Sequence, residues 1–207
     1  MRDTVLTSTG AGASGNIGFT NTVMGDSALS ANARALTVGG TNVTFGAAVG
    51  GASGLIGALT INASDVTQFN DVVSVGSITT DAAGSVKFNI ATTSPASVVT
   101  TGTQTYNDAV VLMHETTFTS SGAGAAGAIR FVSSLMGDSN ATARSFTVNG
   151  IDVSFGGVVG GASGLISAMT VNASGVTQFN DVVSVVSIIT DAPGSVKFNI
   201  ATTSPAS

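Results

Sequence analysis

Apolar residues recur along this chain in short alternating runs that end at glycine. In the segment 36–51, LTVGGTNVTFGAAVGG, residues 36–38 and 43–45 alternate apolar with other side chains. One glycine pair follows the first run and another closes the segment. Alternation with a period of two, bounded by glycine, is typical of short β-strands joined by turns. The pattern therefore predicts an almost wholly β protein with turns at the glycine pairs.

Aromatic residues mark a longer period. Nine of them recur at spacings of 18 to 26 residues, and most have an aliphatic residue two positions before and another four positions after. A coil of this length cannot bury its apolar side chains alone, so it must stack on neighbouring coils. The sequence predicts a parallel β-helix of about nine coils with one internal aromatic column, formed by Phe19, Phe45, Phe69, Phe88, Tyr106, Phe131, Phe155, Phe179 and Phe198.

Asparagine follows the aromatic residue in five of the nine coils. Asparagine tolerates the backbone conformation of a tight corner, and stacked side-chain amides can hydrogen-bond to one another along the axis of a solenoid. We therefore expect a second column, an asparagine ladder formed by Asn70, Asn89, Asn107, Asn180 and Asn199.

A longer repeat divides the chain into two units. Residues 62–97 recur at 172–207 with four substitutions in 36 positions, at an offset of 110 residues, and residues 10–24 align with 122–136. We expect one continuous β-solenoid over residues 1–207, with internal units of about 4–115 and 116–207. Because Ser207 corresponds to Ser97 inside the first unit, we expect the chain to belong to a longer array with further coils.

The composition argues against several classes of partner and site. Only 8% of the residues are charged and the net charge is −5, which disfavours nucleic acid as a partner because phosphate binding needs clustered Lys and Arg. Cysteine is absent, so disulfides and thiolate metal sites are excluded. Mean hydropathy is high at +0.46, but the most apolar stretch, residues 46–59, is shorter than the roughly 20 residues that a spanning helix needs. We expect no membrane span, no cofactor and no metal.

Several phrases of the repeat resemble a known family of proteins. GNIGF (15–19), ALTV (35–38), TNVTFGAAVGG (41–51) and LIGALTINAS (55–64) are similar to the degenerate coil repeats of large bacterial surface exoproteins, namely filamentous-haemagglutinin-like adhesins and autotransporter passengers. The resemblance covers nearly the whole chain. It implies a right-handed β-helical stalk that is exported to the cell surface or beyond it through a parent protein. It also implies adhesion, with host or environmental glycans as partners.

Enzymes that act on polysaccharides also use parallel β-helices, which leaves a catalytic alternative. A lyase or glycosidase needs a cluster of carboxylates, or several aspartates around Ca²⁺ with a nearby cation. The candidates are Asp71, Asp81 and Lys87, which recur as Asp181, Asp191 and Lys197. Each aspartate also suits a structural place: Asp71 and Asp108 follow asparagine at a corner, and Asp81 opens a turn. The structural interpretation is the stronger one, because a single active site needs no copy in each unit.

Two further features give weaker indications of function. The only histidine and the only glutamate, His114 and Glu115, are adjacent between the two units, and they are too few for a metal site or a catalytic triad. Thr-x-Thr sequences, as in ice-binding solenoids, begin at Thr7, Thr20, Thr101 and Thr117, at differing phases relative to the aromatic residues. The sequence thus favours a structural or adhesive stalk segment without catalysis, with a glycan-active enzyme as the alternative and ice binding as a lesser one.

Overall fold

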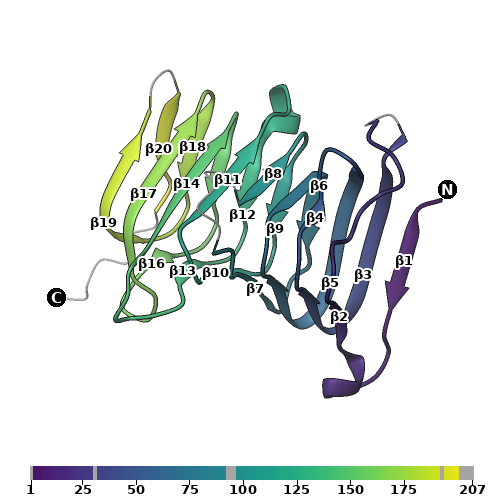
Figure 1. Cartoon of the computed structure of the whole chain (residues 1–207). Coiled ribbons are helices and arrows are strands. Elements are labelled where there is room, and N and C mark those ends of the chain that lie inside the picture. Colours follow the sequence, from purple (N-terminus) through teal and green to yellow (C-terminus); the bar gives the residue numbers. More distant parts are fainter. Residues whose placement is uncertain (1, 30–31, 92–96, 192–193, 201–207) are drawn as a thin grey trace.

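The computed structural model describes residues 2–29, 32–91, 97–191 and 194–200, and this part of the chain is all-β (Figure 1). Besides strands, the secondary structure includes the short 3₁₀ turns η1 (Gly12–Gly15) and η3 (Gly124–Gly127). Over these residues no helix has the length and apolar character needed to cross a membrane.

Twenty strands form one continuous sheet of parallel ladders. Those of the first unit are β1 (Thr4–Thr7), β2 (Ile17–Phe19), β3 (Arg34–Phe45), β4 (Val49–Gly50), β5 (Ile56–Phe69), β6 (Val73–Thr80), β7 (Ser85–Phe88), β8 (Val98–Thr100), β9 (Gln104–Tyr106) and β10 (Ala109–Leu112). Those of the second are β11 (Thr116–Ser120), β12 (Ile129–Phe131), β13 (Leu135–Gly137), β14 (Arg144–Gly150), β15 (Val153–Phe155), β16 (Val159–Gly160), β17 (Ile166–Ala173), β18 (Val176–Phe179), β19 (Val183–Thr190) and β20 (Ser195–Phe198).

The ladders arrange these strands in three columns that run along the stack. The first column contains β1, the first part of β3 and of β5, the second part of β6, and then β9, β12, β15, β18 and β20. The second contains β2, the remainder of β3 and β5, and then β7, β10, β13, β16 and the start of β19. The third contains Val23, β4, the start of β6, β8, β11, β14, β17 and the remainder of β19. This is the architecture of a β-solenoid (Figure 1).

Equivalent strands of the two units lie in different columns. β1 belongs to the first column, whereas its equivalent β11 belongs to the third; β2 belongs to the second, whereas its equivalent β12 belongs to the first. The first unit makes four turns of three strand positions and then adds only β9 and β10 before β11 begins the second unit. Since the fifth turn lacks its third strand, the second unit starts one column early. The repeat is therefore rotated by one column about the axis.

The expected aromatic column is divided into two stacks, because only β8 separates Phe88 on β7 from Tyr106 on β9, whereas the earlier aromatic residues follow one another at every third strand position. Phe19, Phe45, Phe69 and Phe88 stack in the second column with centroids 5.0–5.5 Å apart. Tyr106 continues into Phe131, Phe155, Phe179 and Phe198 in the first column, at 5.1–5.3 Å. The expectation of a single column is wrong at Phe88, because the strand register pairs Phe88 with Leu112 and not with Tyr106.

The two stacks meet inside the solenoid around Phe118 of the third column. Its ring lies edge-on to Phe88 at 5.2 Å and to Phe131 at 5.2 Å, and Phe88 is edge-on to Tyr106 at 5.6 Å. Such edge-to-face contacts are favourable geometries for aromatic pairs. They allow the apolar core to continue across the change of column.

The two glycine pairs of the first unit differ in role. Gly50 and Gly51 have φ angles of +74° and +119° and form the expected turn after β4. Gly39 and Gly40 lie within β3, so the expected turn there is wrong. A Cβ on Gly40 would approach the carbonyl oxygen of Gly15 to 2.5 Å. Glycine at this position therefore allows close packing against the coil below.

The predicted asparagine ladder is interrupted in the same region as the aromatic stack. Asn89 Nδ2 donates to Asn70 Oδ1 at 2.8 Å, and Asn199 Nδ2 donates to Asn180 Oδ1 at 3.4 Å. Asn107 Nδ2 instead donates to the carbonyl oxygen of Thr80 at 2.6 Å. Because Asn89 follows a second-column strand and Asn107 follows a first-column strand, the five amides form two separate pairs with Asn107 outside both.

Candidate functional site

The carboxylates and the lysine expected of an enzyme occupy different parts of the coil. Asp71 lies at the corner between the second and third columns, where its Oδ1 accepts a hydrogen bond from the backbone N–H of Val72 at 2.7 Å. Asp81 lies at the corner between the first and second columns, after β6. Lys87 lies in the middle of β7, paired in register with Gln68 and Val111.

The copies in the second unit repeat these structural roles. Asp181 Oδ1 accepts the N–H of Val182 at 2.7 Å, as Asp71 accepts the N–H of Val72. Asp191 Oδ1 accepts the N–H of Ala173 at 3.0 Å, which joins its corner to the preceding coil. These aspartates act as backbone hydrogen-bond acceptors at corners, the role that short polar side chains commonly play in turns.

Two neighbouring carboxyl groups, on the partly buried Asp81 and the buried Asp108, were not anticipated as a pair from the sequence. Asp108 is 2% exposed, and its Oδ1 accepts the N–H of Gly84 at 2.9 Å. Burial raises the pKa of Asp108, and the charge of Asp81 raises it further, against hydrogen bonds from Thr80 and Gly84 that lower it. Burial likewise raises the pKa of Asp81. Asp81 Oδ1 and Asp108 Oδ2 are both buried without a hydrogen-bond partner.

A polar network is buried where the two units meet. The Tyr106 hydroxyl donates to Gln104 Oε1 at 2.9 Å, and Gln104 Nε2 donates to the carbonyl oxygen of Thr119 at 2.9 Å and to Thr100 Oγ1 at 3.2 Å. Tyr106, Gln104 and Thr100 are each 0% exposed, and burial raises the pKa of Tyr106 well above its usual range. The network ties β8, β9 and β11 together at the change of column.

The histidine and the glutamate lie together in the segment that joins the two units. His114 and Glu115 lie between β10 and β11, where the carbonyl oxygen of His114 accepts a hydrogen bond from Thr116 Oγ1 at 3.0 Å. Within the described ranges no three His, Asp or Glu side chains gather as a metal site would require.

A polar groove crosses the outer face of the first column in the second unit. Arg130, Ser154, Gln178 and Lys197 occupy successive positions in strand register. They line a hollow of about 400 Å³, together with Asp152 and others. At a strand spacing of about 4.8 Å, the two cations lie roughly 14 Å apart along the axis. Side chains with hydrogen-bonding groups lie between them.

Threonine also forms a single-file row along the stack. Thr37, Thr60, Thr79 and Thr105 are in register along the first column. The row continues as Arg130 at the change of units. A charged residue therefore interrupts what would be a flat threonine surface.

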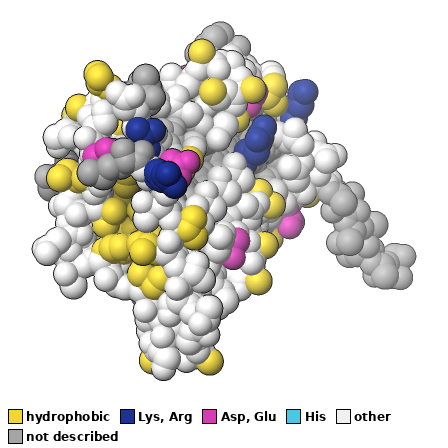
Figure 2. Space-filling model, turned by 90° about the vertical axis from the view of Figure 1, so that its right-hand side faces the viewer, with side chains coloured by type: hydrophobic (Ala, Val, Ile, Leu, Met, Phe, Trp, Pro, Cys, Tyr) yellow, Lys and Arg dark blue, Asp and Glu magenta, His cyan; other side chains and the backbone are white. Residues whose placement is uncertain are grey.

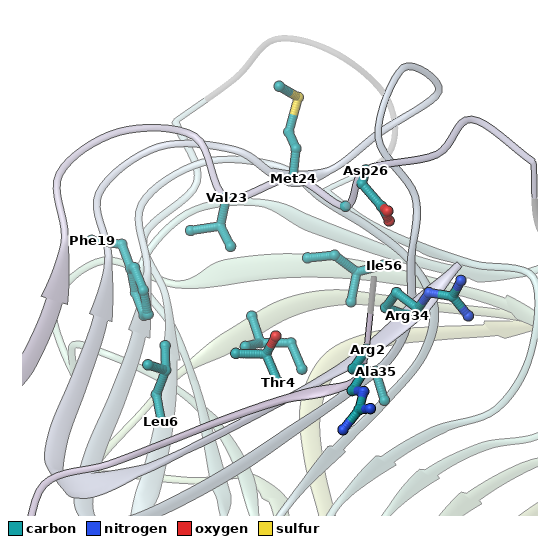
Figure 3. A pocket seen from close by; sticks show the side chains of 12 residues that line it. Arg2, Thr4, Leu6, Phe19, Val23, Met24, Asp26, Arg34, Ala35 and Ile56 are labelled. Carbon is teal, nitrogen blue, oxygen red and sulfur yellow. The ribbon is translucent and has the colours of Figure 1, made fainter. Parts of the chain in front are cut away.

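The N-terminal end of the stack is hollowed and apolar. A hollow of about 400 Å³ opens there, and Figure 3 shows Leu6, Phe19, Val23 and Ile56 pointing toward one another across it. Figure 2, which looks onto this end, shows clustered hydrophobic side chains with Lys and Arg side chains beside them. Among the described strands, β1 pairs only with β3, so its outer edge has no partner strand.

Equivalent residues of the two units differ in exposure at the C-terminal end of the described stack. Ile78, Val86 and Phe88 are each 0% exposed, whereas their equivalents Ile188, Val196 and Phe198 are 42%, 38% and 65% exposed. The first set is covered by β9 and β10 of the following turn. In the second set, the last described strands β19 and β20 pair only with the strands that precede them.

Sequence reasoning missed the pair of Asp81 and Asp108, the polar network and the groove. Each combines residues from successive turns, so no local motif marks it. The adjacency of Asn107 and Asp108 suggested a surface corner, although Asp108 lies against the preceding coil. Comparison with protein-family models, with curated proteins and with solved structures found no match.

Proposed function

We propose that this chain is a structural or adhesive stalk segment of a large exported bacterial surface protein and performs no catalysis. The observation that carries the proposal is the uninterrupted set of parallel ladders across both units. β8, β9 and β10 of the first unit pair with β11, β12 and β13 of the second. In this proposal the solenoid is one right-handed body of about nine coils, located outside the cell or at its surface through the parent protein.

A stack of this kind is suited to span distance. Each turn contacts only its neighbours, so length can be added without altering the core of any other turn. At about 4.8 Å per turn, the nine proposed coils extend on the order of 40 Å. Only 8% of the residues are charged, which supports the same role because strands that stack through backbone hydrogen bonds need few specific ion pairs.

The groove from Arg130 to Lys197 is the feature that best supports an adhesive role. Its guanidinium and ammonium groups can bind anionic groups, while Gln178 and Ser154 between them can exchange hydrogen bonds with hydroxyls. Gln178 Nε2 already donates to Asn180 Oδ1 at 2.6 Å, which holds the amide in place. A glycan lying along the column matches this chemistry better than an isolated small molecule.

The enzymatic alternative receives less support from the same geometry. Asp71 accepts a backbone hydrogen bond at the corner between the second and third columns, whereas Lys87 lies within a strand of the second column. Asp81 adjoins Asp108, and that pair binds backbone groups of the corner. Among the described residues, no basic side chain contributes to the pKa shift of either carboxyl group, so the pair has no electrostatic partner of the kind that lyase chemistry uses.

Two measurements test the proposal. Stretched from its ends in a single-molecule force experiment, the chain should unravel turn by turn with a sawtooth of small, similar extensions. Incubated with a glycan array, it should retain glycans without shortening them, and Arg130→Ala with Lys197→Ala should lose retention. Depolymerisation of any glycan that is abolished by Asp71→Asn would overturn the proposal in favour of an enzyme.

A further inference from the structure

The groove of the second unit has a counterpart on another wall of the solenoid. Its row of outward side chains runs along the first column and consists of Arg130, Ser154, Gln178 and Lys197. The equivalent residues of the first unit are in strand register along the second column, and they are Gly18, Thr44, Gln68 and Lys87. We call these four residues the first-unit row. Because the repeat is rotated by one column, the two rows lie on different walls.

The first-unit row faces outward. Phe45, Phe69 and Phe88 directly follow Thr44, Gln68 and Lys87 in the strands, and each of these phenylalanines is 0% exposed. Successive side chains of a strand point to opposite faces, and the three polar residues are partly exposed. Hydroxyl, amide and ammonium groups are therefore presented to a ligand in the same order as in the groove.

The two rows also share a hydrogen bond that fixes the glutamine. Gln68 Nε2 donates to Asn70 Oδ1 at 2.7 Å, as Gln178 Nε2 donates to Asn180 Oδ1 at 2.6 Å. Each of these asparagines also accepts a hydrogen bond from the asparagine one coil further on. The amide is thus held in the same way on both walls, although one wall belongs to the second column and the other to the first.

We propose that the first-unit row is a second binding site for acidic glycans, so that one molecule binds glycan chains on two walls and bridges them. The inference rests on the adhesive function of the groove and extends it by a second site and by a ligand class, glycans that carry carboxylates. Both rows lie on the side of the stack, so further coils at either end would leave them accessible.

The rows differ at two positions, and the difference sets their relative affinity. Gly18 stands where the groove has Arg130, so the first-unit row has one cation, Lys87. Asn42 stands where the groove has Asp152, and each accepts a backbone N–H of the following coil through Oδ1, at 3.1 and 2.8 Å. A glycan with acidic groups about 14 Å apart therefore makes two charge-assisted contacts in the groove and one in the row. We expect the row to bind such a glycan roughly tenfold more weakly.

Gly18 leaves room for the missing cation. A Cβ on Gly18 would have no heavy atom within 4 Å. Gly18 pairs in register with Thr44 of β3, as Arg130 pairs with Ser154 of β15. Gly18→Arg should therefore place a guanidinium group where the groove has one and convert the first-unit row into a second groove.

Isothermal titration calorimetry with a hexamer of galacturonic acid measures both sites. The unaltered chain should bind at two sites, and Arg130→Ala/Lys197→Ala should retain the weaker one, which a titration detects although the washes of an array remove it. In that background, Lys87→Ala should abolish binding and Gly18→Arg should tighten it roughly tenfold. Ala162→Arg adds the same charge at an exposed turn outside both rows, so this matched control should leave the affinity unchanged.

Two further measurements complete the experiment. A hexamer of galactose, which has no carboxylates, should bind neither row. Light scattering with long polygalacturonate should rise with the unaltered chain, which bridges polymer chains, and should not rise with Lys87→Ala, which has lost one site. The titrations are run at about 0.15 M salt, where the net charge of −5 is screened over about 8 Å. Circular dichroism establishes that each variant is folded, and Lys87→Gln replaces Lys87→Ala if that variant is not.

Four results would overturn the inference while the groove still binds the galacturonate hexamer. They are no binding by Arg130→Ala/Lys197→Ala, residual binding that Lys87→Ala leaves unchanged, a gain for Gly18→Arg no larger than that for Ala162→Arg, and equal binding of the galactose hexamer. Each leaves the adhesive function of the groove standing. An unaltered chain that binds no hexamer at all would overturn the adhesive function, and the inference with it.

Discussion

The pair Phe88 and Phe198 allows the contribution of stacking between turns to be measured in one sequence context. Both lie in the sequence Ser-Val-Lys-Phe-Asn-Ile, at equivalent positions of the two units. Phe88 contacts the rings of Phe69, Phe118 and Tyr106 at centroid distances of 5.5, 5.2 and 5.6 Å. Among the described residues, Phe198 has one ring neighbour, Phe179, at 5.2 Å.

The expected magnitudes follow from burial. Phe88 is 0% exposed, and replacing a fully buried phenylalanine by alanine costs about 3–5 kcal/mol through lost transfer free energy and the cavity that remains. Phe198 is 65% exposed. Only about a third of the roughly 1.5–3 kcal/mol of burial free energy applies there, so Phe198→Ala should cost about 0.5–1 kcal/mol.

Urea denaturation followed by circular dichroism measures both losses. It should be run at a protein concentration low enough to keep the chain monomeric, and with a shared slope for the comparison of midpoints. A loss below about 1 kcal/mol for Phe88→Ala would refute the packing argument. So would equal losses for the two variants, because the sequence context is the same and only the covering turn differs.

Three further predictions concern the hydroxyl group of Tyr106, the carboxyl group of Asp108 and the backbone of Ala83. Tyr106→Phe should lower the free energy of unfolding by about 1–2 kcal/mol, because it leaves Gln104 Oε1 buried without its donor, and thermal unfolding measures the loss. Asp108→Asn should raise the free energy of unfolding at pH 7. Because the pKa of Asp108 is raised in the folded state, stability is lost as pH rises and the carboxyl group becomes charged. The difference in stability between Asp108→Asn and the unaltered chain should therefore vanish in urea titrations below the ordinary pKa of 3.8. Ala83→Gly should gain about 0.5–1 kcal/mol because Ala83 has φ +89°, whereas the control Ala82→Gly should lose stability in the same assay.

Much of the local architecture was predictable from the pattern of side chains. The inward positions of Phe45 and Phe155 follow from period-two alternation, and both are fully buried. The turn at Gly50 follows from glycine's access to positive φ. Gly39 was misread because a glycine pair can serve either a turn or a close approach between backbones, and only the neighbouring coil distinguishes the two.

The candidate sites were far less predictable, because each depends on which residues from different turns share a corner. Asp108 and Asp81 are 27 positions apart in the sequence, yet the charge of one raises the pKa of the other. Arg130 and Lys197 line one groove because β15 and β18 stack in register between their strands, β12 and β20. Neither proximity leaves a local signal in the sequence.

By itself the sequence predicted the all-β class and most of the aromatic residues that face the core, although it left out Phe118 and Phe146, which are buried in the third column. These depend on alternation and spacing within one turn, which act over a few residues. The column that each strand occupies was decided by the tertiary structure, because it depends on the number of strand positions that precede it. Only β8 lies between Phe88 on β7 and Tyr106 on β9, so Tyr106 falls one column early and begins a new stack instead of extending the stack that ends at Phe88.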